Sequence, residues 1–387
     1  MNRKQFTLLV AALVILGGLV WALKQREESS WSRSESRVGQ KLLKTFDVND
    51  VADIRIDNGH TAVTLSKKDG QWRVKERGTY PANFTMIGDL LLKIQDQKII
   101  QSDTITAEQR PQLELNEPSK EKPSATMVEL KDASGKVIEK LLLGKRYTKK
   151  GANGAEMSAG RYVIVSSDEK TVALIDHPLL ESEPKPEAWI NKDFVRADKI
   201  KAITFNNNDG SLAWKMIRDQ DAGEWRLADA KPNEKFDSSR GTSAVNAISM
   251  MNFTDVVAST ASVDTGMDKP RTVVADTFDG LTYTFRVGNG AGDDNQYLGV
   301  SVSGEPSKER VTATGEKPED KPRLDKEFKE RLVKLETRLK FEKTLSNFTY
   351  ITSKWRLDPL LKDRAGLMMD KQNAEAPTVT PINPRVK

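Results

Sequence analysis

The sequence of 387 residues contains no cysteine and only two histidines. Without a thiol, the chain has no disulfide scaffold, no thiolate metal site, no cysteine nucleophile and no lipidated cysteine anchor. The histidines, His60 and His177, lie in an Asn-Gly loop and before a proline, and neither belongs to a ligand pattern such as H-E-x-x-H. We therefore predict surface-loop positions for both, with a ligand or base role as the alternative.

Catalytic and phosphate-binding motifs are also missing. The chain has no G-x-S-x-G, no P-loop and no G-x-G-x-x-G, and the segment that begins at Gly144 lacks the rest of a phosphate loop, so we interpret it as a turn. Asp69, Asp209 and Asp279 each precede a glycine, which is typical of hairpin turns. The oxygen-rich stretch 289–295 does not have EF-hand spacing, which favours a loop over a calcium site. We predict no enzyme active site, no cofactor and no metal.

The charges of the chain are balanced and dispersed. Sixty-one basic and 56 acidic residues give a net charge of +5. A protein that reads nucleic acid usually has a concentrated basic face, and none is visible in the sequence. We therefore predict no nucleic-acid partner.

One long apolar run stands out against this polar background. Residues 6–23 carry no charge, and as a helix they would measure about 27 Å, close to the thickness of a bilayer core. The exit at Trp21 to Lys24 fits a signal-peptide cleavage site poorly. We predict a cytoplasmic tip and transmembrane anchor at 1–28 and a polar stalk at 29–44, with the bulk of the chain outside the inner membrane.

Two similar stretches follow, at 45–180 and 195–305. Each alternates apolar and polar residues in short runs, then shows helical spacing, at 84–97 and 242–253, and then alternates again. Matching positions keep their order: Trp72 and Trp225 lie 153 residues apart, for example. The pattern predicts an α+β fold in which two tandem copies of a mainly antiparallel sheet-plus-helix unit follow the transmembrane helix and precede a C-terminal helix.

The two tryptophans allow two interpretations. Trp72 and Trp225 occupy the same strand position in the two copies and are flanked by charged residues. This favours half-buried core positions, and the alternative is a stacking platform for a glycan.

The C-terminal part is predicted to comprise a charged linker at 306–323, a helical segment at 324–370 and a disordered tail at 371–387. In the helix, Glu327/Arg331, Glu330/Lys334 and Glu336/Lys340 are candidate ion pairs at i,i+4. The candidate partner-binding residues form an apolar stripe that steps by four, three and four: Phe328, Leu332, Leu335 and Leu339. This stripe either packs back onto the second copy or binds a partner.

Three segments resemble a bacterial family called domain of unknown function 4340: the strand 161–165, the connection through Trp189 and Ile190, and the run 198–205. The likeness covers roughly residues 45–305. It implies a membrane-anchored protein of unknown biochemistry that works beside an ABC-type transport or gliding-motility-like system. The family supplies no site residues.

These observations predict a non-enzymatic, extracytoplasmic accessory or scaffold protein at the inner membrane, with protein partners in the envelope. Two alternatives remain open: a ligand-binding module, for example for glycans, and a hydrolase with an unrecognised site. The oligomeric state and the identity of the partner stay open.

Overall fold

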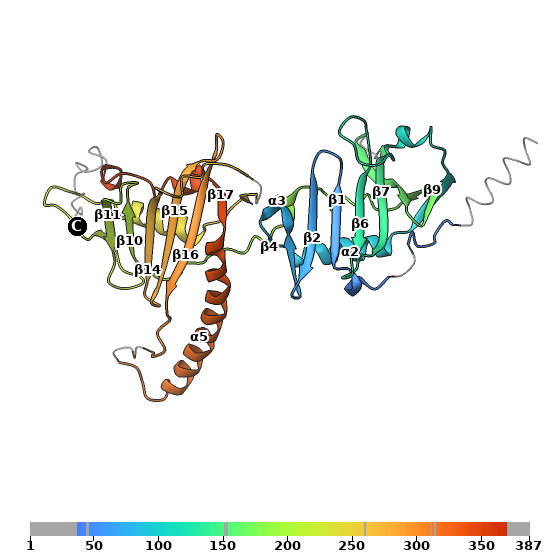
Figure 1. The fold of residues 1–387 in the computed structure, drawn as a ribbon. Helices are drawn as coiled ribbons and strands as arrows, with labels where there is room; N and C mark the ends of the chain where they lie inside the picture. Colours follow the sequence, from blue (N-terminus) through green and yellow to red (C-terminus); the bar gives the residue numbers. More distant parts are fainter. Residues whose placement is uncertain are drawn as a thin grey trace, which may run out of the picture. The chain divides into compact units, whose positions relative to one another are not determined.

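The computed structural model describes residues 37–43, 46–150, 154–258, 261–310, 312 and 315–369. The chain divides into two compact units, Met1–Asn191 and Lys192–Lys387. In Figure 1 the first unit runs from blue to green and the second from yellow-green to red. Each unit is described by itself.

The first unit is built on a nine-stranded antiparallel sheet with the strand order β4-β3-β2-β1-β6-β7-β8-β9-β5. Its strands are β1 (Asp53–Asp57), β2 (Ala62–Lys68), β3 (Gln71–Val74), β4 (Tyr80–Pro81), β5 (Ile99–Thr104), β6 (Thr126–Lys131), β7 (Val137–Lys150), β8 (Glu156–Val165) and β9 (Asp168–Ile175). Its helices are η1 (Val48–Asp50), η2 (Lys75–Arg77), α2 (Phe84–Asp96), η3 (Arg110–Leu113) and α3 (Pro186–Trp189).

Alternation of side chains gives this sheet two covered faces. On β1, Ile54 and Ile56 are fully buried between more exposed neighbours, as period-2 patterning requires. Helix α2 begins after Asn83, whose side-chain oxygen accepts a hydrogen bond from the Met86 N–H at 3.2 Å, and it buries one apolar side. A second apolar cluster comprises Ile105, Leu115, Ala125, Leu142, Ile164 and Val172.

The loop 105–125 passes very close to strand β7 at Gly144. A Cβ atom at this position would lie 2.3 Å from the carbonyl oxygen of Leu113. Gly144 lies inside β7, so the prediction of a turn there is wrong. The residue is needed as glycine because the loop backbone occupies the space of a side chain.

The second unit contains an eight-stranded antiparallel sheet with the order β12-β11-β10-β14-β15-β16-β17-β13. Its strands are β10 (Ile200–Asn206), β11 (Leu212–Ile217), β12 (Arg226–Leu227), β13 (Asp255–Val256), β14 (Arg271–Thr277), β15 (Leu281–Gly290), β16 (Asn295–Gly304) and β17 (Thr349–Ser353). Its helices are α4 (Ser238–Ser249), α5 (Lys321–Thr344), η4 (Leu345–Asn347), α6 (Lys354–Leu357) and η5 (Ala365–Leu367).

The two sheets share one strand order. Strands β3-β2-β1-β6-β7-β8-β9-β5 of the first correspond in sequence to β12-β11-β10-β14-β15-β16-β17-β13 of the second. Helices α2 and α4 occupy the same place in the order of elements of the two units, because they come just before β5 and β13, respectively. The units differ in their connections. Among the described residues, η2, β4 and η3 have no counterpart in the second unit, and β9 follows β8 directly, whereas α5 and η4 come between β16 and β17.

The close approach at Gly144 also recurs. Gly288 on β15 would place a Cβ atom 2.0 Å from the carbonyl oxygen of Thr265, in the loop that precedes β14. On the neighbouring strand, Arg161 Nε donates to the Gly144 carbonyl at 2.8 Å, and Gln296 Nε2 donates to the Gly288 carbonyl at 2.9 Å. The same loop-over-strand arrangement is therefore built twice.

The predicted fold class, an α+β fold with a transmembrane helix, is wrong. The described chain consists of two antiparallel sheets with few helices. Within the described ranges no helix is both long and apolar enough to cross a bilayer. The predicted span, residues 6–23, and the predicted tail, residues 371–387, lie outside the described residues.

Two features explain why the structure contains more β-strand than the sequence pattern predicted. The long β7–β8 hairpin continues through charged residues that lack apolar alternation, and its pairing extends, with two register shifts, as far as Lys150 and Glu156. Strand β17 lies in the segment predicted to be helical, where it pairs with both β16 and β13. These strands form because of tertiary pairing, which local patterns report poorly.

Candidate partner-binding site at helix α5

Helix α5 is held to the second unit mainly through its C-terminal half. Leu339 is 6% exposed and Glu342 is fully buried. The N-terminal half, from Lys321 onward, carries mostly exposed side chains. The helix therefore combines a packed end with an end that is covered only in part (Figure 1).

A buried polar cluster fixes the packed end. The Tyr283 hydroxyl donates to Glu342 Oε2 at 3.0 Å, and the Arg196 backbone N–H donates to Glu342 Oε1 at 2.8 Å. Arg338 lies 3.4 Å from Glu342 Oε1 through Nε and donates through a terminal nitrogen to Asp198 at 3.0 Å. Every oxygen of the buried carboxylate thus faces a donor, which a buried charge requires.

Burial changes the titration of this cluster. It raises the pKa of Glu342 above its ordinary value, although the Arg196 N–H and the Arg338 charge act in the opposite direction. Burial also raises the pKa of Tyr283, and the nearby Glu342 carboxylate adds to that rise. Relative to water, both shifts favour the protonated form of the group over the charged form.

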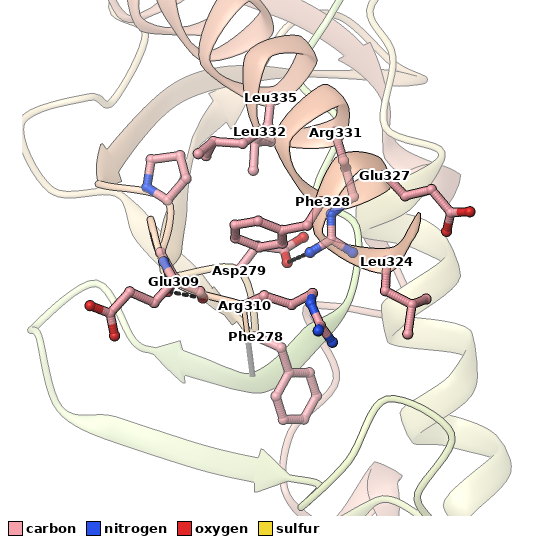
Figure 2. Close-up of a pocket in the computed structure, with 12 residues that line it drawn as sticks. Phe278, Asp279, Glu309, Arg310, Leu324, Glu327, Phe328, Arg331, Leu332 and Leu335 are labelled. Carbon is pink, nitrogen blue, oxygen red and sulfur yellow. Dashed lines mark hydrogen bonds and ion pairs between the residues drawn. The ribbon is translucent and has the colours of Figure 1, made fainter. Parts of the chain in front are cut away.

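The predicted apolar stripe is also buried at the C-terminal half of α5 and only partly covered at the N-terminal half. Leu339 is buried, whereas Phe328, Leu332 and Leu335 are half-buried. All three line one cavity, which has a volume of about 420 Å³. Figure 2 shows the three side chains together on this side of the helix. They are therefore brought together on one side of α5, facing a space that the described chain leaves unfilled.

The opposite wall of the cavity comes from two loops. Phe278 and Asp279 belong to the turn between β14 and β15, in which Gly280 has a φ of +84°. Pro306 and Arg310 belong to the segment that leaves β16. The Asp-Gly pattern predicts a turn at Asp279, but it does not indicate the place of this residue in the site. The available signal was Phe278, because a large apolar side chain is unusual beside an Asp-Gly turn.

Ion pairs form the rim of the cavity. Arg331 of α5 lies 3.6 Å from Asp279 (Figure 2). Lys199 also approaches Asp279, at 3.6 Å. Arg310 donates to Glu316 at 2.6 Å and to Asp325 at 2.7 Å. The hydrogen bonds that Arg310 donates to these two carboxylates raise its pKa above the ordinary value. The arrangement is an apolar groove with a charged border, which is suited to holding apolar side chains of a partner.

The other candidate residues from the sequence do not meet at this groove. His60 lines a different, polar pocket in the first unit. His177 Nδ1 accepts a hydrogen bond from the Leu179 N–H at 3.1 Å, so it stabilises a loop. Trp72 and Trp225 are each 6% exposed, which places both in the core rather than on a sugar-binding face.

The oxygen-rich turn near β16 is occupied by a cation of the chain itself. The Lys354 ammonium donates to the carbonyl oxygens of Gly292 and Asp293. Across the described ranges, no group of three or more histidine, aspartate or glutamate side chains is placed to hold a metal ion.

The family model for a domain of unknown function, DUF4340, matches residues 72–270, just over half of the chain. The chain belongs to the DUF4340 family. No curated protein and no solved structure matches the chain. Helix α5 and Phe278 lie beyond the residues that the DUF4340 model matches.

Proposed function

We propose that this DUF4340 protein is a non-enzymatic accessory subunit that binds a protein partner through the groove of helix α5. The observation that carries the proposal is the half-buried state of Phe328, Leu332 and Leu335 over an unfilled cavity. An apolar stripe that served only the core would be covered along its whole length, as Leu339 is.

The chemistry of α5 favours one kind of occupant. Residues 321–344 include nine basic and five acidic side chains, and one of the acids, Glu342, is buried. A partner helix with apolar residues on one face and carboxylates beside them would fill the groove and complement this charge.

The proposal places the protein at the inner membrane, on its outer side, beside an ABC-type transport or gliding-motility-like assembly. The apolar run 6–23 and the family resemblance support this location. Protease added to spheroplasts should digest the body of the protein while cytoplasmic proteins stay intact. Protection of the body under these conditions would exclude the location.

The groove is tested by placing charges in it. The double variant Leu332→Asp/Leu335→Asp puts two carboxylates against an apolar wall, which prevents docking of another apolar face. The matched control is Val333→Asp/Thr337→Asp, because both side chains are exposed on the same helix and the charge change is equal. Photocrosslinking in native membranes from position 328, followed by mass spectrometry, identifies the occupant.

We expect the groove variant to lose the crosslinked partner and the control to keep it, with similar melting temperatures for both. Two results together would show that the stripe serves intramolecular packing. The second unit of the groove variant would melt several degrees lower, and the wild type would crosslink no partner. A crosslink to residues 371–387 would identify the chain's own C-terminus as the occupant and would also exclude the proposal.

A further inference from the structure

The end of the β7–β8 hairpin in the first unit projects beyond its neighbouring strands. On one side, pairing with β6 ends at Leu143. On the other side, pairing with β9 ends at Arg161. Residues 144–150 and 156–160 therefore pair only with each other in the described part of the sheet, over a length of about 20 Å.

This projecting end, hereafter the hairpin arm, carries a concentration of positive charge. Lys145, Arg146, Lys149 and Lys150 are all exposed. Between residues 145 and 161 the chain has five basic side chains and a single acidic one, Glu156. Among the ion pairs of the described residues, none within 4 Å involves these four exposed cations. Within the described residues, the arm thus presents four cations that make no ion pair.

Two arginines face each other at the base of the arm. Arg146 and Arg161 are directly opposite in the β7–β8 register, so their side chains lie on the same face. Arg161 donates to the Gly144 carbonyl at 2.8 Å and to the Leu143 carbonyl at 3.2 Å, and no carboxylate of the described chain pairs with it. Burial, and then the Arg146 charge, lower the pKa of Arg161 to about 10.

A polar pocket of about 490 Å³ adjoins Arg161. Lys120 and Lys122 add two further cations to its lining, and Glu114 and Glu121 offset part of this charge. The positive region therefore extends from the arm onto the loop that crosses the sheet.

The second unit shows that the fold does not need these charges. Gln296 takes the place of Arg161 and donates to the Gly288 carbonyl at 2.9 Å through a neutral amide. The corresponding hairpin end carries Asp293 and Asp294 in place of lysines. A neutral side chain satisfies the same backbone carbonyl, so the guanidinium of Arg161 and the lysines of the arm exceed what the architecture requires.

Apolar groups lie among the cations of the arm. Met157 is 62% exposed and lies opposite Lys149 in the register. Tyr147 packs edge-on against Tyr162 with a centroid separation of 6.5 Å, and the Lys149 ammonium lies 5.8 Å from the Tyr147 ring centroid. Lysines mixed with tyrosine and an exposed apolar chain are typical of segments that sit at the headgroup level of a bilayer.

We propose that the hairpin arm binds the phosphate headgroups of an anionic phospholipid surface. The lysines and Arg146 attract the lipid phosphates, a phosphate beside Arg146 and Arg161 relieves their mutual repulsion, and Met157 enters the boundary of the acyl region. An acidic protein would engage the cations equally, but it would give no reason for an exposed methionine at their centre. This surface lies in the first unit and is independent of the α5 groove.

The absence of cysteine makes a local test possible. The variant Met157→Cys carries one thiol, which takes a single environment-sensitive fluorophore. With phosphatidylglycerol vesicles we expect the emission of the label to shift to the blue, and with phosphatidylcholine vesicles to stay unchanged. The control is Val333→Cys on α5, because Val333 is also 62% exposed. A label at 333 reports any membrane contact that the rest of the full chain makes.

Charge removal completes the test. In the labelled protein, Lys145→Gln/Lys149→Gln/Lys150→Gln should weaken partitioning to phosphatidylglycerol roughly 100-fold. Lys326→Gln/Lys329→Gln/Lys334→Gln removes the same charge from α5 and should leave the partitioning unchanged. Three results would overturn the proposal. The label at 157 could respond equally to both lipids, the arm variant could partition as strongly as the parent protein, or the label could respond to polyglutamate but not to vesicles. A response to inorganic phosphate alone would assign the arm to a free anion and would also overturn it.

Discussion

The hydroxyl of Tyr283 and the carboxylate of Glu342 lie 3.0 Å apart, and this hydrogen bond joins strand β15 to the packed end of helix α5. Both residues are almost fully buried, so neither can turn to water if its partner is lost. The groove depends on this hydrogen bond, because the bond fixes the position of the partly exposed N-terminal half of α5 relative to the β14–β15 turn.

Removing the hydroxyl should loosen the helix. Tyr283→Phe leaves one oxygen of a buried carboxylate without a donor, and we expect a loss of about 1–3 kcal/mol from the stability of the second unit. Calorimetry measures the loss, and hydrogen exchange in residues 321–344 locates it. Tyr297→Phe on the neighbouring strand is the control, and it should change the stability of the second unit and the hydrogen exchange of α5 little. Unchanged exchange in α5 after Tyr283→Phe would show that the hydrogen bond does not hold the helix.

Glu342 also predicts a dependence on pH. Its pKa in the folded protein is raised above the ordinary value of 4.5, chiefly by burial. Above 4.5 the unfolded chain releases a proton that the folded chain retains, so this contribution to stability is complete in acid and is lost as the pH rises through the folded pKa.

The variant Glu342→Gln cannot titrate and serves as the reference. Denaturant unfolding at a series of pH values measures the free energy of unfolding of both proteins. The excess of the wild type over this variant should shrink as the pH rises from acid toward neutrality. An advantage that grows with pH would mean that Arg338 and the Arg196 N–H outweigh burial.

Glu234 predicts the opposite dependence. Arg364 donates to both of its oxygens, at 2.8 and 2.7 Å, and these hydrogen bonds lower the pKa of Glu234 to about 2. The stabilisation is therefore present above pH 4.5 and is lost as the pH falls toward about 2. The difference in unfolding free energy between the wild type and Glu234→Gln should shrink over that range. Glu336→Gln, at an exposed position on α5, should show no such change.

Gly144 predicts a steric effect in the first unit. In Gly144→Ala the new Cβ would meet the Leu113 carbonyl at 2.3 Å, so the loop 105–125 must move, at a cost of about 1–3 kcal/mol. Gly88→Ala is the control, because nothing lies within 4 Å of a Cβ at this position in α2, and alanine there should stabilise the helix by up to about 1 kcal/mol. Chemical denaturation measures both. Equal effects of the two substitutions would contradict the close approach.

The sequence predicted best those elements whose signals are local. The alternation through Ile54 and Ile56 indicated β1, and the helical spacing at 84–97 became α2 at Phe84–Asp96. The helix expected at 242–253 begins four residues earlier, at Ser238, because the Asp237 side chain accepts a hydrogen bond from the Ser239 N–H. That capping signal was present in the sequence and was overlooked.

The features that determine the site depend on distant partners. Strand β17 exists because β16 and β13 flank it, and no short pattern around Tyr350 distinguishes it from the end of a helix. Arg331 was expected to pair with Glu327 along the helix, but it lies 3.6 Å from Asp279 in another part of the unit. An exposed i,i+4 pair is worth only a few tenths of a kcal/mol, so a tertiary contact readily replaces it.

The late position of β17 sets an order of events during synthesis. In the first unit, β5 can pair with β9 fewer than 80 residues later. In the second unit, β13 must wait for β17 until the whole of α5 has been made. At about 5–20 residues per second the ribosome needs roughly 5–20 s for that interval. Strand β16 is complete about 45 residues before β17 begins, so for roughly the last 2–9 s of that interval its far edge is an open ladder, available to chaperones or to the strand of another chain.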